Sequence, residues 1–143
     1  MTSIEKMFDS AIELRDKGEL REAAKVLLTI IANFSNDSRI AGVHGVLGGI
    51  YNDLEDHEKA FENFQKATIL KPRSELASLG LYLSYVKLDK SEKAIEELFR
   101  YLINNPAKLY KDTLEELLED LEKGYMTDYE KEIKDVARKN GVH

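Results

Sequence analysis

Apolar side chains recur every three or four positions along most of the chain, and short polar segments interrupt this pattern at regular intervals. The spacing predicts amphipathic helices, because residues three and four apart lie on one face of an α-helix. The clearest case is residues 38–72, which predict two helices joined by a short polar turn. The apolar face of the first helix consists of Val43, Val46, Leu47, Ile50 and Tyr51. The second helix, from about residue 57 to 70, should end before Pro72, because proline lacks an amide proton and clashes with the preceding helical turn.

Similar pairs of helices are predicted on both sides of this central pair. Residues 2–16 predict a helix that ends at Gly18, and a second helix follows directly. Residues 74–104 predict another pair, and its first helix is apolar nearly all round, which is typical of a helix covered on two sides. Residues 107–140 predict a last, less regular pair, with Gly124 ending one helix and Gly141 the other.

Polar residues with short side chains are expected to cap several of these helices. Asp37 or Ser38 should cap the first helix of the central pair, and Ser91 should cap the second helix of the following pair. Thr127 and Glu130 stand three residues apart, as in a capping box, and predict the start of the last helix.

Two landmarks repeat with the same period. Ala94 follows Ala60 by 34 residues, and Pro106 follows Pro72 by 34 residues. Ala23, the equivalent position in the first pair, precedes Ala60 by 37 residues, so three extra residues must lie in a longer second helix or turn. An equal period in two landmarks indicates a stacked two-helix unit. We therefore predict an all-α solenoid.

The central pair carries the landmark residues of a known 34-residue helical repeat. These are His44, Leu47, Gly48, Tyr51, Ala60, Phe64 and Pro72, with His44 in the place of the usual tryptophan. Over residues 4–106 the chain resembles the tetratricopeptide repeat (TPR) family, of the small stand-alone type found in bacteria. The resemblance implies a right-handed helical-hairpin solenoid in one domain, residues 1–143. Its repeats would span about 4–37, 41–74 and 75–108, with a capping hairpin at 109–140.

The third repeat departs from the family pattern at two positions. Tyr82 and Tyr101 stand where the family has small residues. Their bulk should widen the contact with the next helix or tilt that helix. Elsewhere Gly48, Ala60 and Ala94 should allow close helix crossings, with Phe64 filling the space between helices.

The resemblance also implies a function, since the family holds peptide or protein segments in a concave groove formed by the first helix of each pair. The residues at its groove positions here are Phe8, Ile12, Arg15, Gly42, Gly45, Gly49, Asn52, Leu76, Leu79, Leu83 and Val86. Some family members bind acidic chaperone tails through a cationic clamp. The clamp positions here are occupied by Phe8, Ile12, Val46, Leu76 and Gly80. None of these is cationic, so we do not expect chaperone-tail binding of that kind.

Three glycines are expected on the floor of the groove, at positions 42, 45 and 49. Each glycine within a helix costs on the order of 0.5–1 kcal/mol relative to alanine, so helix propensity does not explain them. One hypothesis is that a partner helix or strand lies over Gly42, Gly45 and Gly49 and contacts Leu79 and Leu83. The alternative is that these glycines only allow helices of the same chain to pack closely.

Composition and charge narrow the function classes. The chain has no cysteine, no apolar run long enough for a transmembrane helix and no signal-peptide pattern at its start, so we expect a cytoplasmic protein without membrane contact. Its formal net charge of −6 argues against nucleic-acid binding, which depends on clustered cations. Ten carboxylates against three lysines between residues 112 and 135 serve either to attract a cationic partner or to keep a capping hairpin soluble.

Candidate chemical sites are few. His44 replaces a bulky aromatic residue and is expected to pack, and no second histidine or cysteine stands at ligand spacing from it. The glycine-rich segment at 42–49 lacks the Lys-Ser/Thr ending of a phosphate loop, and Glu115 and Glu119 lie along a solvated helix face. We expect no enzyme activity, no metal and no cofactor.

The sequence thus favours a non-catalytic adaptor that binds a protein or peptide of unknown identity in an apolar groove. The alternative is a dedicated inhibitor, such as an immunity protein that neutralises a basic toxin. A third hypothesis is a homo-oligomeric structural subunit, for example a homodimer joined through the groove or through Tyr82 and Tyr101.

Overall fold

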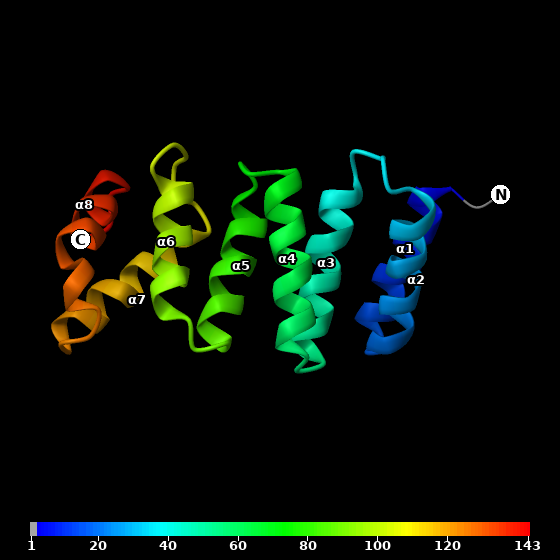
Figure 1. Cartoon of the computed structure of the whole chain (residues 1–143), viewed down its shortest axis with the longest axis horizontal. Helices are drawn as coiled ribbons and strands as arrows, with labels where there is room; N and C mark the ends of the chain where they lie inside the picture. Colours follow the sequence, from blue (N-terminus) through cyan, green and yellow to red (C-terminus); the bar gives the residue numbers. More distant parts are fainter. Residues whose placement is uncertain (1–2) are drawn as a thin grey trace.

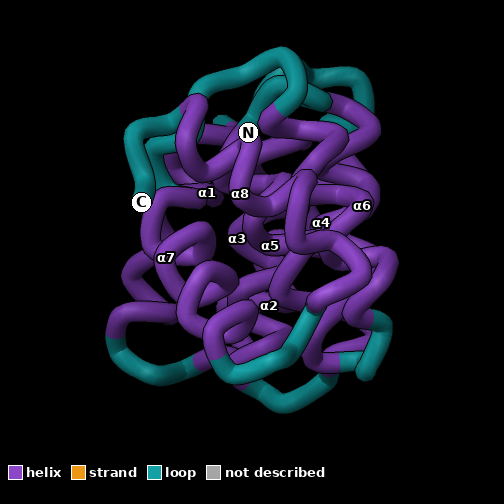
Figure 2. The backbone as a smooth tube through the Cα atoms, turned by 90° about the vertical axis from the view of Figure 1, so that its left-hand side faces the viewer, coloured by secondary structure: helices purple, strands orange, loops and turns teal. Residues whose placement is uncertain are grey.

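The computed structural model describes residues 3–143 and is all-helical over that range, with no strand. Its α-helices are α1 (Ile4–Asp16), α2 (Leu20–Asn33), α3 (Ile40–Asp53), α4 (His57–Leu70), α5 (Glu75–Lys87), α6 (Ser91–Leu102), α7 (Tyr110–Glu122) and α8 (Glu130–Lys139). A short 3-10 helix, η1 (Thr127–Tyr129), precedes α8. The helices follow one another in a row, with the two termini at opposite ends (Figure 1). A view along the row shows the connecting loops gathered at the two ends of the helices (Figure 2).

The predicted helices are all present, and most of their boundaries agree with the apolar pattern. The three extra residues expected between the first and central helix pairs lie mainly in the connection between α2 and α3. This connection spans residues 34–39, whereas residues 71–74 join α4 to α5. Within residues 3–143, no helix is both long and apolar enough to cross a membrane.

Three capping predictions are wrong. Helix α3 begins at Ile40, and Asp37 instead accepts a hydrogen bond from the backbone amide of Arg39 over 2.9 Å and pairs with its guanidinium group. These bonds from Arg39 lower the pKa of Asp37 to about 2. Ser91 is the first residue of α6 and not its N-cap, and Thr127 opens the 3-10 turn that precedes α8. None of α3, α6, η1 and α8 has a side-chain hydrogen bond at its N-cap.

The four turns that join the helices of each pair share one backbone geometry. Each turn places one residue in the left-handed region, at φ between 58° and 89°: Gly18, Glu55, Asp89 and Gly124. The next amide then donates to the carbonyl five residues earlier over 2.8–2.9 Å: Glu19 to Leu14, Asp56 to Tyr51, Lys90 to Tyr85 and Tyr125 to Asp120. This bond is part of the Schellman motif, which ends helices and reverses the chain. The same local solution recurs in every pair, including the last.

The ring of Phe64 is wedged between α3 and α5. Gly48 on α3 and Gly80 on α5 face it from two sides, and a Cβ atom built on Gly48 would lie 2.8 Å from the ring. A Cβ atom on Gly80 would lie closer still. Real Cβ atoms do not approach aromatic carbons this closely, so both positions require glycine. The expectation that Gly48 permits a close crossing is confirmed, and Gly80 does the same on the opposite side.

A buried polar network joins α5, α6 and α7. The Ser78 hydroxyl donates to Glu97 Oε2 over 2.7 Å and lies 2.8 Å from the Tyr110 hydroxyl. Because Ser78 has one proton and gives it to Glu97, Tyr110 must donate to Ser78. Arg100 completes the network with hydrogen bonds of 2.8 and 2.6 Å to the two oxygens of Glu97. Burial raises the pKa of Tyr110 far above its usual value, so this phenol remains a donor at all physiological pH values.

Three tyrosines hold α7 away from α5 and α6. Tyr82 packs edge-on against Tyr110, with ring centroids 6.0 Å apart, and Tyr101 packs against the same ring at 5.8 Å. Helix α7 runs obliquely to the helices before it, which agrees with the tilt expected from bulk at positions 82 and 101 (Figure 1). Tyr82 and Tyr101 are both buried, so the hypothesis that they form a surface for self-association is wrong.

We predict that Gly80→Ala destabilises the protein. The added methyl group must displace the Phe64 ring or shift α5, and overpacking of this kind outweighs the gain in helix propensity, giving a net loss of about 1–2 kcal/mol in the free energy of unfolding. Urea denaturation measures this loss. Shortening the ring with Phe64→Leu in the same variant should recover part of it, and a Gly80→Ala variant that unfolds at a higher urea concentration than wild type would contradict the wedge.

A second prediction compares two fully buried serines of α5. Ser78→Ala leaves the buried Tyr110 hydroxyl without an acceptor and should cost about 1–3 kcal/mol in the free energy of unfolding. Ser84 has the only buried side-chain oxygen without a hydrogen-bond partner in residues 3–143, so Ser84→Ala should leave stability unchanged or raise it by up to about 1 kcal/mol. Thermal unfolding of both variants checks the prediction, and equal losses would show that the network contributes nothing specific.

Candidate functional site

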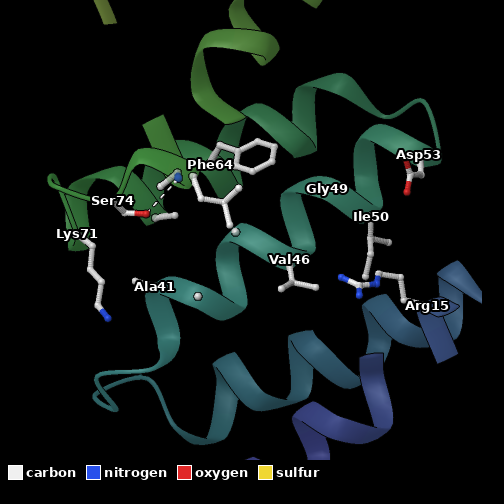
Figure 3. Close-up of a pocket in the computed structure, with 14 residues that line it drawn as sticks. Arg15, Ala41, Val46, Gly49, Ile50, Asp53, Phe64, Lys71 and Ser74 are labelled. Atoms are coloured by element: carbon white, nitrogen blue, oxygen red, sulfur yellow. Dashed lines mark hydrogen bonds between the residues drawn. The ribbon is translucent and has the colours of Figure 1, made fainter. Parts of the chain in front are cut away.

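A hollow of about 600 Å³ opens over α3, between α1 on one side and α5 on the other (Figure 3). Its lining comes from α3 (Ala41, Gly42, Gly45, Val46, Gly49, Ile50 and Asp53), α1 (Arg15), α4 (Phe64 and Ala67), α5 (Leu76 and Ala77) and the α4–α5 connection (Lys71 and Ser74). In Figure 3, Lys71 and Ser74 lie at one end and Arg15 and Asp53 at the other, with apolar side chains between them. The hollow is thus apolar along its length and charged at both ends.

The hollow brings together five of the eleven predicted groove residues: Arg15, Gly42, Gly45, Gly49 and Leu76. A neighbouring hollow of about 470 Å³ between α1 and α3 contains Phe8 and shares Gly42 with the first. The two hollows together form a trough along α3, and we call this trough the groove below.

The remaining five predicted residues do not line either hollow. Asn52 is engaged within the chain, where its side-chain oxygen lies 3.1 Å from Nδ1 of His57. Leu79 is partly buried against the core formed by α5, α6, α7 and α8, and Ile12 is half-buried on α1. Leu83 and Val86 lie further along the exposed face of α5.

The three groove glycines face open space. A Cβ atom built on Gly42, Gly45 or Gly49 would meet no neighbouring atom within 4 Å, outside the backbone of its own helix and its adjacent residues. This differs from Gly48 and Gly80, which need to be glycine because of Phe64. Close packing of the chain on itself therefore explains Gly48 and Gly80 and leaves the groove glycines without an internal explanation.

Helix α5 extends the apolar surface beyond the hollow. Leu76, Leu83 and Val86 are 68 %, 46 % and 41 % exposed. Their spacing of seven and three residues places them on one face of the helix, beside the partly buried Leu79. A row of exposed aliphatic side chains next to an apolar hollow is typical of a surface that binds another molecule.

Two residues of α4, Phe64 and Ala67, were missed by the sequence prediction. The resemblance places groove residues only on the first helix of each pair, but the glycines of α3 have no side chains to cover the helix behind them. Lys71 and Ser74 were missed because they follow α4 in a turn. Gly45 and Gly49 are the sequence signal for these four residues, because a helix without side chains at these positions leaves the elements behind it open to the groove.

His44 packs as expected. It is 6 % exposed, and its Nδ1 lies 2.9 Å from Oδ1 of Asn63. The amide of Asn63 donates to the carbonyl of Lys59 over 2.8 Å, which turns Oδ1 toward His44, so Nδ1 of His44 carries the proton. Within residues 3–143, no group of three or more histidine, cysteine or carboxylate side chains has a geometry that could hold a metal ion.

Comparison with known proteins adds no assignment. No protein-family model matches the chain, and no curated protein matches it.

We predict that Gly45→Ala and Gly49→Ala each stabilise the protein. The new methyl group meets no other helix, so helix propensity alone decides the outcome, and each variant should gain about 0.5–1 kcal/mol in the free energy of unfolding. Urea denaturation measures the gain, with Gly48→Ala as the matched control that should lose stability. Destabilisation by Gly45→Ala would indicate that another part of the chain covers this position.

Proposed function

We propose that this chain is a non-catalytic, cytoplasmic interaction protein of the TPR type that holds a segment of a partner protein in the groove. The repeated unit is supported by the 34-residue spacing of its landmarks and by the same helix-ending turn in all four helix pairs. In this proposal α1, α3 and α5 form the concave wall of a small right-handed solenoid, and α7 and α8 cap it.

The observation that carries the proposal is the open space above the three groove glycines. Selection for stability alone favours alanine at positions 42, 45 and 49, because the change costs no packing. Glycine is advantageous there if another backbone must approach α3 closely. An apolar anchor of such a partner gains roughly 1.5–3 kcal/mol when it is fully buried.

A dedicated inhibitor of a basic protein is the second candidate, and the acidic composition of α7 favours it. Inhibitors bind in the nanomolar range or tighter, whereas adaptors for short segments bind in the micromolar range, so affinity for the natural partner separates the two.

The proposal predicts that filling the groove removes binding without loss of stability. Peptides selected for binding to wild type from a displayed random library should bind Gly45→Leu at least about tenfold more weakly, because the leucine side chain occupies the space of one anchor. Isothermal titration calorimetry gives the dissociation constants, and the variant should unfold at the same temperature as wild type or a higher one, because leucine has a higher helix propensity than glycine. Ala32→Leu, at an exposed position of α2 outside the groove, is the matched control. Selected peptides that bind Gly45→Leu as well as wild type would contradict the proposal.

A further inference from the structure

Side chains from α5 and α8 hold the backbone of the chain where it enters α7. Asn140, at the end of α8, accepts a hydrogen bond through Oδ1 from the amide of Ala107 over 2.8 Å. Glu75, at the start of α5, accepts hydrogen bonds through Oε2 from the amides of Lys108 and Tyr110 over 2.8 and 3.0 Å. Three amides at the start of α7 are thus bonded to side chains that stand 33 to 35 positions away in the sequence.

Asn140 uses both ends of its side-chain amide. While Oδ1 accepts from Ala107, Nδ2 donates to the carbonyl of Val136 over 2.9 Å. A carboxylate offers acceptors only, so aspartate could make the first of these bonds but not the second. Asparagine is therefore the side chain that joins the last turn of α8 to the start of α7.

The backbone after Asn140 is fixed as well. Gly141 lies in the left-handed region at φ 74°, as is usual for a glycine that ends a helix. Its amide donates to the carbonyl of Arg138 over 3.0 Å, and the amide of Val142 donates to the carbonyl of Ala137 over 2.8 Å. The side chain of Val142 is buried in the core that α5, α6, α7 and α8 share.

Asn140 is the only asparagine of the chain that is followed by glycine. In such a pair the backbone nitrogen of glycine can attack Cγ of asparagine, because glycine has no side chain to block the approach. The new N–Cγ bond closes a succinimide ring, the Cγ–Nδ2 bond breaks, and ammonia leaves with the proton of the glycine amide. Water then opens the ring at one of its two carbonyls and gives aspartate or isoaspartate. The reaction needs water and no other reactant.

The folded structure prevents this ring closure. The nitrogen of Gly141 must rotate toward Cβ of Asn140, but ψ of 12° at Asn140 keeps it turned away. That rotation breaks the hydrogen bonds that the amides of Gly141 and Val142 donate. Attack on Cγ also requires the side chain to leave Ala107 and Val136. The reaction therefore requires a local opening in which the end of α8 separates from the start of α7.

We propose that Asn140 is a deamidation site that is closed while α8 is docked on the start of α7 and reacts only when this contact opens. The product does not restore the closed state. An ionised carboxylate cannot donate to the carbonyl of Val136, and its charge is unfavourable at the C-terminal end of a helix. Isoaspartate also adds one atom to the backbone within the turn that ends α8.

The modification thus turns a transient opening of this region into a lasting one. The site lies outside the groove, so this inference goes beyond the proposed function and does not depend on it.

The first test compares deamidation in the folded and unfolded full-length protein under mildly alkaline conditions. Peptide mapping with mass spectrometry detects the exchange of the amide nitrogen for oxygen at Asn140. The reaction should be at least about tenfold slower in the folded protein than in guanidinium chloride, because only the open fraction reacts. Equal rates in the two states would overturn the proposal.

The second test asks whether docking controls the reaction. Glu75→Ala removes the acceptor of two amides next to Ala107, on a helix that does not carry the reacting pair, and should raise the rate at Asn140 at least about fivefold. Glu75→Gln keeps an acceptor oxygen and should give a smaller increase. Glu62→Ala, at an exposed position of α4, is the matched control and should react like wild type. Rates equal to wild type in both Glu75 variants would overturn the role of docking.

The third test concerns the product. Asn140→Asp reproduces one of the two products, and deamidated wild type separated by ion exchange contains both. In each, amide hydrogen exchange should be at least about fivefold faster than in unmodified wild type at Gly141 and Val142, and unchanged at Leu47 in α3. Exchange at Gly141 and Val142 that matches unmodified wild type would show that the product closes again and would overturn the lasting effect.

Discussion

The contact on which the middle of this molecule depends is the ring of Phe64 between Gly48 and Gly80. Because neither flanking residue has a Cβ atom, α3 and α5 approach α4 closely at these points, and the ring fixes their separation. The groove lies beside this contact, and Phe64 is part of its lining. Phe64 and Ala67 of α4 also reach the lining of the groove, because Gly45 and Gly49 of α3 have no side chains to cover them.

The opposite solution joins α5 to α7. The rings of Tyr82 and Tyr101 pack against the ring of Tyr110, and Tyr82 occupies the position that Gly48 has in the preceding pair. The hydroxyl of Tyr110 belongs to the buried network of Ser78, Glu97 and Arg100. Large rings separate the helices, and α7 runs obliquely to the helices before it (Figure 1). Since hydrogen bonds in this network are directional, they fix the tilt more strictly than apolar packing alone would. The helices thus pack closely at Gly48 and Gly80 and lie further apart between α5 and α7.

Much of this architecture could be predicted from the sequence because it depends on local patterns. Apolar spacing gave the helices, Gly18 and Gly124 marked two of the four turns, and the positions of Gly48 and Tyr82 indicated a close and a wide crossing. Glu55 and Asp89 gave no such indication, because they adopt the left-handed region without being glycine. The contact of Glu75 with the start of α7 was also hidden, since residues 33 and 35 positions apart meet only after folding.

The glycines of α3 divide into two groups that sequence alone does not separate. Gly48 is required by a neighbour within the chain, whereas Gly42, Gly45 and Gly49 have space for a side chain and carry none. Gly48 increases stability because it allows close packing. The three groove glycines reduce stability, because a glycine loses more backbone entropy on folding and no contact within the protein compensates for that loss. A helix that keeps three such residues on one exposed face, beside Leu76 and Leu83, is less stable than its fold allows. These glycines therefore find no compensating interaction within residues 3–143, and the proposed function supplies one through the backbone of a bound partner.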